Sequence, residues 1–141
     1  IITKGIRHLE QTPTRIDNSI DSHARLLALR SARSEAISSN IANSATPGYQ
    51  ARDVDIGREF SSYLNQSGPN IQKTQPGHME ISGAGSFDLM YRIPQKVSEN
   101  GNTVEPETEL SAFTENAIHY QAGLQFLSSK INGLRLALKG E

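Results

Sequence analysis

Apolar side chains recur at helical spacing in the last third of the chain. Between Leu110 and Leu138 they are separated by alternating steps of three and four residues, which is the a/d pattern of a coiled coil. The positions on this pattern are Leu110, Phe113, Ala117, Tyr120, Leu124, Leu127, Ile131, Leu134 and Leu138. Pro106 suits the first turn of a helix and Lys139 suits the last turn. The pattern therefore predicts one long helix over residues 106–141 with an apolar seam along it.

A second helix is predicted near the other end of the chain, over residues 16–43. Neither Pro nor Gly interrupts this segment, and Asp17 or Ser19 can cap its first turn. Its apolar and small positions are Ile20, Ala24, Leu27, Ser34 and Ile41, and they are flanked by Leu26, Leu29, Ala36 and Ile37. Such a wide stripe suits a helix that packs on more than one side.

The two predicted helices leave two interpretations open. They can close on each other as an ordinary two-helix hairpin, or each can keep part of its apolar face for other molecules. A single hairpin would not cover both the wide stripe of the first helix and the long seam of the second, so we favour assembly. The a/d positions of the last helix are then predicted to form an assembly seam.

A turn is strongly indicated directly after the first helix. Asn43 suits the end of a helix because Asn tolerates the left-handed conformation. Thr46 is pushed toward extended geometry by the proline that follows it. Pro47 and Gly48 suit the two central positions of a type II turn. We expect this turn to set the direction in which the chain leaves the helix, with Tyr49 packed against a neighbouring element.

The segment between the two helices carries weaker signals. Residues 61–85 are rich in Ser, Gly, Asn, Gln and Pro, which favours an extended or flexible loop. From Phe87 onward apolar and polar residues alternate, as in a half-buried strand. Asn100-Gly101 is the strongest hairpin-turn signal in the chain. These features predict a small β-hairpin over residues 87–104, at the base of the last helix.

The predicted fold class is mainly α. Two long terminal helices form a coiled-coil-like pair, with a small β-hairpin and an extended loop between them. At 141 residues a single domain is expected. We interpret residues 1–15 as an N-terminal extension that can be flexible and 16–49 as the first helix with its turn. Residues 50–105 are the loop and hairpin region, and 106–141 are the last helix.

Composition excludes several classes of function. The chain has 14 basic and 15 acidic residues, without the clustered excess of Lys and Arg that nucleic-acid binding needs. It contains no cysteine, which excludes disulfides and thiolate metal sites. No apolar run approaches the roughly 20 residues that span a bilayer, so no direct membrane insertion is expected. No secretory signal is recognised either, so work outside the cytoplasm would need another export route.

No catalytic constellation is recognised. The four histidines share no spacing with carboxylates and lie at His8, His23, His78 and His119. Asp53 and Asp55 could flank a cation, but no further oxygen ligands accompany them, so a solvated surface pair is favoured. We therefore expect no catalytic residue, no metal site, no cofactor and no small-molecule substrate.

Two groups of residues resemble a known family. The first group resembles the N-terminal signature of bacterial flagellar axial proteins and runs Asn40-Ile41-Ala42-Asn43, Thr46-Pro47-Gly48-Tyr49, then Gln50-Ala51-Arg52-Asp53. The second group makes the chain most similar to the proximal member of the basal-body rod proteins and comprises Asn100-Gly101-Asn102-Thr103-Val104, Glu109, Phe113, Asn116, Tyr120-Gln121, Leu124, Leu127 and Gly133-Leu134. Other rod and hook proteins usually carry an Asn-Val/Leu-x-x-Glu-Met run near their C-termini, which this chain lacks.

The resemblance implies a structural role. It suggests a subunit of the flagellar basal-body rod, the drive shaft that transmits motor torque, in which the two terminal helices form an inner axial domain. The implied partners are other copies of the chain, other rod proteins, and the MS-ring adaptor and export-gate proteins at the proximal end. The implied location is the periplasmic rod, reached through the flagellar type III apparatus without a cleaved signal. The alternatives are a different flagellar axial protein and a coiled-coil adaptor unrelated to flagella.

Overall fold

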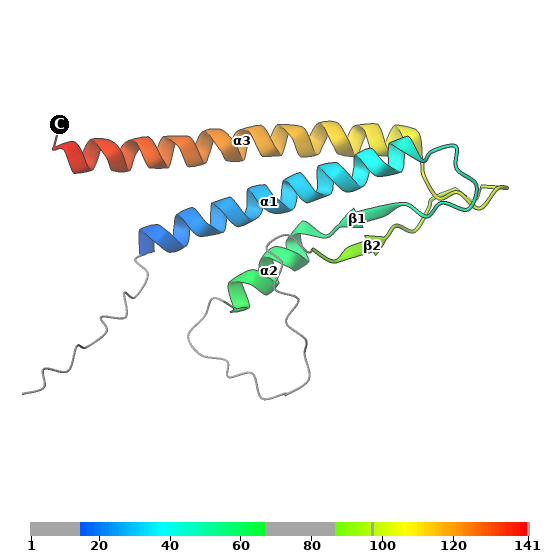
Figure 1. Cartoon of the computed structure of the whole chain (residues 1–141), viewed down its shortest axis with the longest axis horizontal. Coiled ribbons are helices and arrows are strands. Elements are labelled where there is room, and N and C mark those ends of the chain that lie inside the picture. Colours follow the sequence, from blue (N-terminus) through cyan, green and yellow to red (C-terminus); the bar gives the residue numbers. More distant parts are fainter. Residues whose placement is uncertain (1–14, 67–86, 97, 141) are drawn as a thin grey trace, which may run out of the picture.

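Two long helices dominate the molecule and lie side by side (Figure 1). The computed structural model describes residues 15–66, 87–96 and 98–140. In chain order the elements are α1 (Arg15–Ala42), β1 (Arg52–Val54), α2 (Ile56–Gln66), β2 (Leu89–Tyr91) and α3 (Pro106–Lys139). The predicted fold class is confirmed: the protein is mainly helical, its terminal helices are in contact, and a small antiparallel sheet lies between them in the sequence.

Some predictions fall on residues outside the described ranges. These are the N-terminal extension over residues 1–14, most of the polar loop over 67–86, and two of the histidines, His8 and His78. The extension and the loop therefore stay predictions.

Helix α3 begins and ends where local sequence signals place it. Glu105, directly before the helix, is extended, and Pro106 occupies its first turn. Glu107 and Glu109 lie near the N-terminus and Lys139 lies in the last turn, so their charges complement the helix dipole. Gly140 ends the helix in the left-handed conformation with φ of 70°.

The terminal helices run antiparallel, and a line of α3 residues with seven-residue spacing faces α1. Asn40 near the end of α1 contacts Glu109 near the start of α3, whereas Ser19 near the start of α1 contacts Lys130 late in α3. The α3 residues of this line, each of which faces α1, are Glu109, Asn116, Gly123 and Lys130. None of these residues belongs to the predicted apolar seam. The seam is divided instead, because Tyr120, Leu127 and Leu134 are partly buried while the others are exposed.

Helix α1 lies at the centre of the fold because it contacts α3, β1 and α2. Among the described residues, the buried apolar side chains are Leu29, Ala36, Ile37, Ala51 and Val54. Three of these five come from α1, from the residues that widen its predicted stripe. A wide stripe therefore did indicate packing on more than one side. Within the described ranges no helix is both long and apolar enough to cross a membrane.

The predicted β-hairpin is wrong in its pairing. Strand β2 pairs antiparallel with β1, and the register places Arg52 opposite Tyr91 and Val54 opposite Leu89. The Asn100-Gly101 turn does form, since the Gly101 amide donates to the Ser98 carbonyl and Gly101 has φ of 74°. The chain after this turn joins the loop that follows α1 rather than β2.

Helix α2 lies in a segment that was predicted to be a loop. Its start is capped by Asp55, whose side chain accepts a hydrogen bond from the Arg58 amide at 3.1 Å. Ile56, Phe60 and Tyr63 then recur at helical spacing. The polar composition from residue 61 onward concealed this short amphipathic helix.

Gly123 provides a test of the helix pairing. A Cβ atom at this position would lie 3.0 Å from Leu27 Cδ2, whereas a Cβ atom at Gly133 would meet nothing within 4 Å. We therefore expect Gly123→Val to lower the free energy of unfolding by about 1–3 kcal/mol through overpacking. Gly133→Val on the same helix should be nearly neutral. Urea denaturation of both variants measures the difference, and equal effects would show that the two helices do not approach closely at Gly123.

Candidate functional site

The turn after α1 has the predicted geometry. The Tyr49 amide donates to the Thr46 carbonyl at 3.3 Å, and Gly48 has φ of 72°, as the second corner of a type II turn requires. The Tyr49 hydroxyl points back to α1, where it lies 3.2 Å from Ser39 Oγ and 3.4 Å from Asn40 Oδ1. The expected packing of Tyr49 against a neighbouring element is therefore present, and that element is α1 itself.

Asn102 holds the loop that carries this turn. Its side-chain amide donates to the carbonyls of Asn43, Ser44 and Thr46 at 2.8–3.0 Å. Its side-chain oxygen accepts a hydrogen bond from the Val104 amide. These carbonyls follow the last turn of α1, where backbone acceptors lack partners within the helix. The side chain of Asn102 is buried and satisfies acceptors that would otherwise need water.

The two groups of residues that carry the family resemblance meet at this point. The Gly48 amide donates to the Asn100 carbonyl at 2.9 Å, and the Thr103 amide donates to the Tyr49 carbonyl at 3.0 Å. The Thr103 hydroxyl also accepts a hydrogen bond from the Ala51 amide. The turn after α1 and the segment before α3 are therefore joined along their backbones, at the end of the molecule opposite the C-terminus (Figure 1).

Asn40 connects this joined end to both helices and to the sheet. Its side-chain amide donates to the Arg52 carbonyl at 2.7 Å, and its side-chain oxygen accepts from the Arg52 amide at 3.0 Å. It thus pairs with the backbone of β1 as a neighbouring strand would. The same amide donates to Glu109 Oε2 at 3.2 Å. Asn40 and Glu109 are both completely buried.

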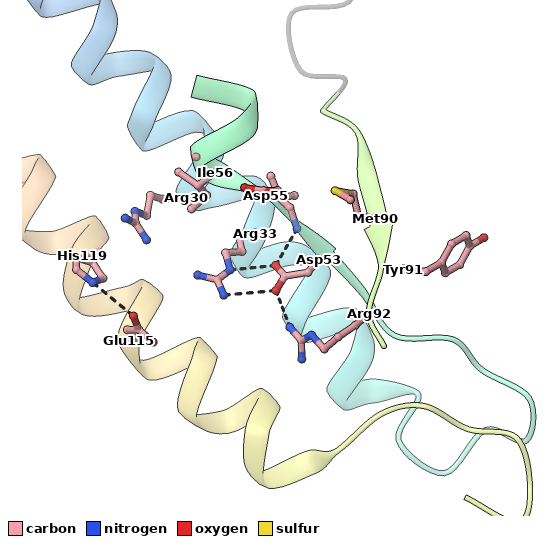
Figure 2. A pocket seen from close by; sticks show the side chains of 12 residues that line it. Arg30, Arg33, Asp53, Asp55, Ile56, Met90, Tyr91, Arg92, Glu115 and His119 are labelled. Carbon is pink, nitrogen blue, oxygen red and sulfur yellow. Dashed lines mark hydrogen bonds and ion pairs between the residues drawn. The ribbon is translucent and has the colours of Figure 1, made fainter. Parts of the chain in front are cut away.

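A cluster of two arginines and two carboxylates extends from this contact. Asp53 lies between Arg33 and Arg92 (Figure 2), with nitrogen–oxygen distances of 3.0 and 2.7 Å. Arg92 also forms an ion pair with the buried Glu109. The four side chains come from α1, β1, α3 and the position directly after β2. Each buried charge therefore has an opposite charge from a different element.

The environment of Asp53 shifts its protonation equilibrium. Burial alone would raise the pKa of this carboxyl, but hydrogen bonds from Arg33 and Arg92, the positive charge of Arg33 and the Val54 amide oppose that effect. The net result is a pKa below the usual range for Asp. The interpretation of Asp53 and Asp55 as a solvated surface pair is therefore wrong for Asp53, which is held by arginines, whereas Asp55 is exposed and caps α2.

The predicted motif and turn residues gather at this one end but differ in exposure. Asn40 is buried, Ile41, Asn43 and Tyr49 are partly buried, and Ala42, Thr46, Pro47, Gly48, Asn100 and Gly101 are exposed. The seam positions that stay exposed are Leu110, Phe113, Ala117, Leu124, Ile131 and Leu138. The motif residues thus build a joint, while more than half of the seam residues remain on the surface.

Sequence reasoning missed the roles of the buried polar residues. Glu109 was noted in the sequence only as part of the family resemblance, and Arg92 was only one of the polar positions in the alternating segment after Phe87. The available signal was that polar residues recur in α3 at seven-residue spacing, at Glu109 and Asn116. Within the described residues, no group of three His, Cys, Asp or Glu side chains could hold a metal ion.

Asn40 offers a direct test of the joint. Replacing it with Leu keeps a similar volume but leaves the Arg52 amide, the Arg52 carbonyl and Glu109 without this partner. Because each unsatisfied buried polar group costs about 1–3 kcal/mol, Asn40→Leu should lower the free energy of unfolding by at least about 2 kcal/mol. Asn132→Leu, on an exposed position of α3, is the matched control and should have little effect. Similar values for the two variants in urea denaturation would contradict the assigned role.

The Asp53 ion pairs predict a pH dependence of stability. Because the folded-state pKa is lowered, ionised Asp53 stabilises the fold above the unfolded pKa of about 3.9, and this contribution is lost as the pH falls toward the lower folded value. Asp53→Asn should therefore be less stable than the parent at pH 7, and the difference should shrink below about pH 4. Asp21→Asn, at an exposed position of α1, controls for removal of a carboxylate. A difference for Asp53→Asn that stays constant down to about pH 2 would contradict the prediction.

Comparison with known proteins identifies the family. Residues 20–50 match the family described as flagella basal body rod protein. The chain is 39% identical over 126 residues to the flagellar basal body rod protein FlgB of Aeromonas hydrophila, covering 89% of this chain and 96% of that protein. It is 41% identical over 120 residues to FlgB of Cereibacter sphaeroides, covering 84% and 92%. It is 35% identical over 133 residues to FlgB of Salmonella typhimurium, covering 89% and 96%. The chain therefore belongs to the FlgB family of flagellar basal body rod proteins, structural and non-enzymatic subunits that assemble with other rod proteins.

Proposed function

We propose that this rod subunit takes its place at the proximal end of the rod and joins its neighbours through the face of α3 that α1 leaves uncovered. The observation that carries the proposal is the division of the apolar seam. The uncovered face repeats every seven residues and consists of Leu110, Ala117, Leu124, Ile131 and Leu138. Four of these five are large apolar side chains that are 41–88% exposed.

The energetics of this face favour contact with another subunit. Burying a Leu or Ile side chain contributes about 1.5–3 kcal/mol relative to leaving it in water, before the loss of motional freedom on binding is subtracted. The exposed positions share one side of a helix of 34 residues, which spans about 50 Å. An apolar line of this length with a seven-residue repeat suits a parallel or antiparallel helix from a neighbouring subunit.

The joined end of the molecule supports a role in transmitting torque. Asn102 and Asn40 fix the direction in which the chain leaves α1, and the ion pairs of Asp53 hold the sheet against the helices. A drive shaft needs subunits that deform little under load, and a fully hydrogen-bonded joint between two long helices meets this need. The helices would then form the inner axial part of the rod.

The remaining parts of the proposal concern partners and location. We infer contacts with further copies of this chain, with the adaptor between the MS ring and the rod, and with export-gate proteins. Export would proceed through the flagellar type III apparatus without a cleaved signal, into the periplasmic rod. The support for these statements is the family resemblance of the two motif groups.

Aspartate substitutions along α3 test the proposed face. Leu124 is exposed, so the carboxylate introduced by Leu124→Asp would be buried only on assembly. This variant should therefore leave the folded subunit stable but block rod assembly and swimming. A buried unpaired charge costs several kcal/mol, more than one contact supplies. Leu127→Asp should instead destabilise the subunit itself, because Leu127 is partly buried in the single chain.

The matched control is Gln125→Asp, at the exposed position next to Leu124. The Gln125→Asp subunit should assemble normally, and cells that carry it should swim normally. The measurements are thermal unfolding of the purified subunits and the yield of intact basal bodies from cells that depend on this chain. Normal assembly of Leu124→Asp would exclude the proposed face.

A further inference from the structure

A groove of about 650 Å³ opens where α1, α3, the sheet and the start of α2 meet (Figure 2). Its polar side contains Arg30, Arg33 and Arg92 together with Asp53 and Glu115. The apolar face of α3 does not include this groove, and the joined end shares with it only the ion pairs of Asp53, so the proposed function leaves the rest of the groove unexplained.

Among the described residues, the charged side chains that line the groove have partners with one exception. Asp55 accepts a hydrogen bond from the Arg58 amide. Arg33 and Arg92 hold Asp53, and Arg92 also holds Glu109. Glu115 lies 3.7 Å from His119 on the same helix. Arg30 makes no hydrogen bond or ion pair through its guanidinium with any residue in the described ranges, and Figure 2 shows it apart from the cluster around Asp53.

The surroundings of Arg30 are unfavourable for a positive charge in the single chain. Burial and the nearby charge of Arg33 lower the pKa of Arg30, and Glu115 only partly opposes them. The contact that Arg30 does make uses its backbone, whose carbonyl accepts a hydrogen bond from Asn116. Any residue at this position could supply that carbonyl. This backbone contact therefore does not require the arginine head group, and a partly buried guanidinium beside a second one is unfavourable for the single chain.

The apolar wall of the groove indicates what kind of ligand fits. Ile56 and Met90 line it, and Met90 is 42% exposed, whereas the Tyr91 side chain points away from the groove (Figure 2) and its ring lies near the guanidinium of Arg52. A site for a small free anion is usually built from backbone amides and several convergent cations. One free guanidinium beside Met and Ile side chains is instead typical of a protein interface, where Arg and Met are enriched.

We propose that this groove receives a segment of a neighbouring rod subunit, and that Arg30 binds an Asp or Glu side chain of that segment. The inference rests on the proposed function, since it assumes that the chain assembles with rod proteins. We choose a carboxylate as the ligand because its negative charge complements that of Arg30 and would offset the repulsion between Arg30 and Arg33. A carboxylate can also bind a guanidinium through two parallel hydrogen bonds. The apolar wall of the groove would contact the aliphatic side-chain atoms of the same segment.

Substitution of Arg30 distinguishes this role from a structural one. Arg30→Gln should leave thermal stability of the purified subunit unchanged or raised, because it removes an unpaired charge. In cells that depend on this chain, the same variant should reduce the amount of subunit recovered in basal bodies by about tenfold or more, as expected for loss of a charge-assisted hydrogen bond. Arg30→Lys should restore assembly in part. Arg15→Gln, at an exposed position at the start of α1, is the matched control and should assemble normally.

A photo-crosslinking amino acid in place of Met90, whose side chain faces the groove, identifies the occupant directly. We expect it to capture a rod protein, through a peptide with Asp or Glu within one helical turn of the crosslinked residue, and to lose the crosslink when Arg30→Gln is added. A crosslinked segment without an acidic residue would overturn the proposal. So would a loss of monomer stability in Arg30→Gln, or equal assembly defects in Arg30→Gln and Arg15→Gln.

Two further outcomes separate the alternatives. Titration of the purified subunit with inorganic phosphate, followed by NMR of the Arg side chains, should show no site at Arg30. Millimolar or tighter binding there would mean that the groove takes a small anion and would overturn the choice of a protein carboxylate. If Leu124→Asp blocks assembly but Arg30→Gln does not, this inference fails and the proposed function stands. If neither variant affects assembly, both fail.

Discussion

The fold depends on the need to satisfy one buried carboxylate. Glu109 is completely removed from water inside a protein whose apolar core, in the part the structure describes, is small. A buried charge of this kind is tolerated only with an opposite charge and further hydrogen bonds. Arg92 supplies the charge and Asn40 supplies the hydrogen bond, while Arg92 also pairs with Asp53, which Arg33 holds from its other side. Because these five residues come from α1, β1, α3 and the segment after β2, the requirements of all of them are met together only when those elements have this one arrangement.

This constraint explains why two separate parts of the sequence carry the family signature. Asn40 and the Thr46–Tyr49 turn lie more than fifty residues from Asn102, yet they share one hydrogen-bonded joint. Asn102 supplies the donors that the end of α1 lacks, and Gly48 supplies the positive φ that brings its own amide to the Asn100 carbonyl. Each motif is incomplete without the other. The side chains in the joint are chosen by the backbone groups that they must satisfy, and not by their hydrophobicity.

Local sequence patterns predicted part of this fold, whereas contacts between residues far apart in the sequence were not predictable from them. Apolar periodicity and Pro-Gly chemistry are local signals, and they correctly predicted both terminal helices and the turn at Gly48. The partner of β2 depends on contacts across the fold, so the nearby Asn100-Gly101 turn suggested a hairpin that does not form. The line of α3 residues that faces α1 could not be found by searching for apolar residues, because Glu109 and Asn116 are polar and Gly123 has no side chain. Helix α2 could have been predicted from the sequence, since Asp55 and the spacing of Ile56, Phe60 and Tyr63 are a local signal.

Helix α3 thus reverses the usual arrangement of an amphipathic helix in a single chain. The line of α3 that faces α1 contains a carboxylate, an amide, a glycine and a lysine. The apolar and exposed line consists of Leu110, Ala117, Leu124, Ile131 and Leu138. Polar contacts between helices are weak in net free energy but demanding in geometry, and a single buried Asn can fix the register of a helix pair. Apolar contacts are stronger but tolerate sliding, because one leucine can replace another at the next heptad. In the proposed assembly, a subunit that uses the polar line for its own fold and the apolar line for its neighbours therefore sets its register within the chain, before the face that can slide is used.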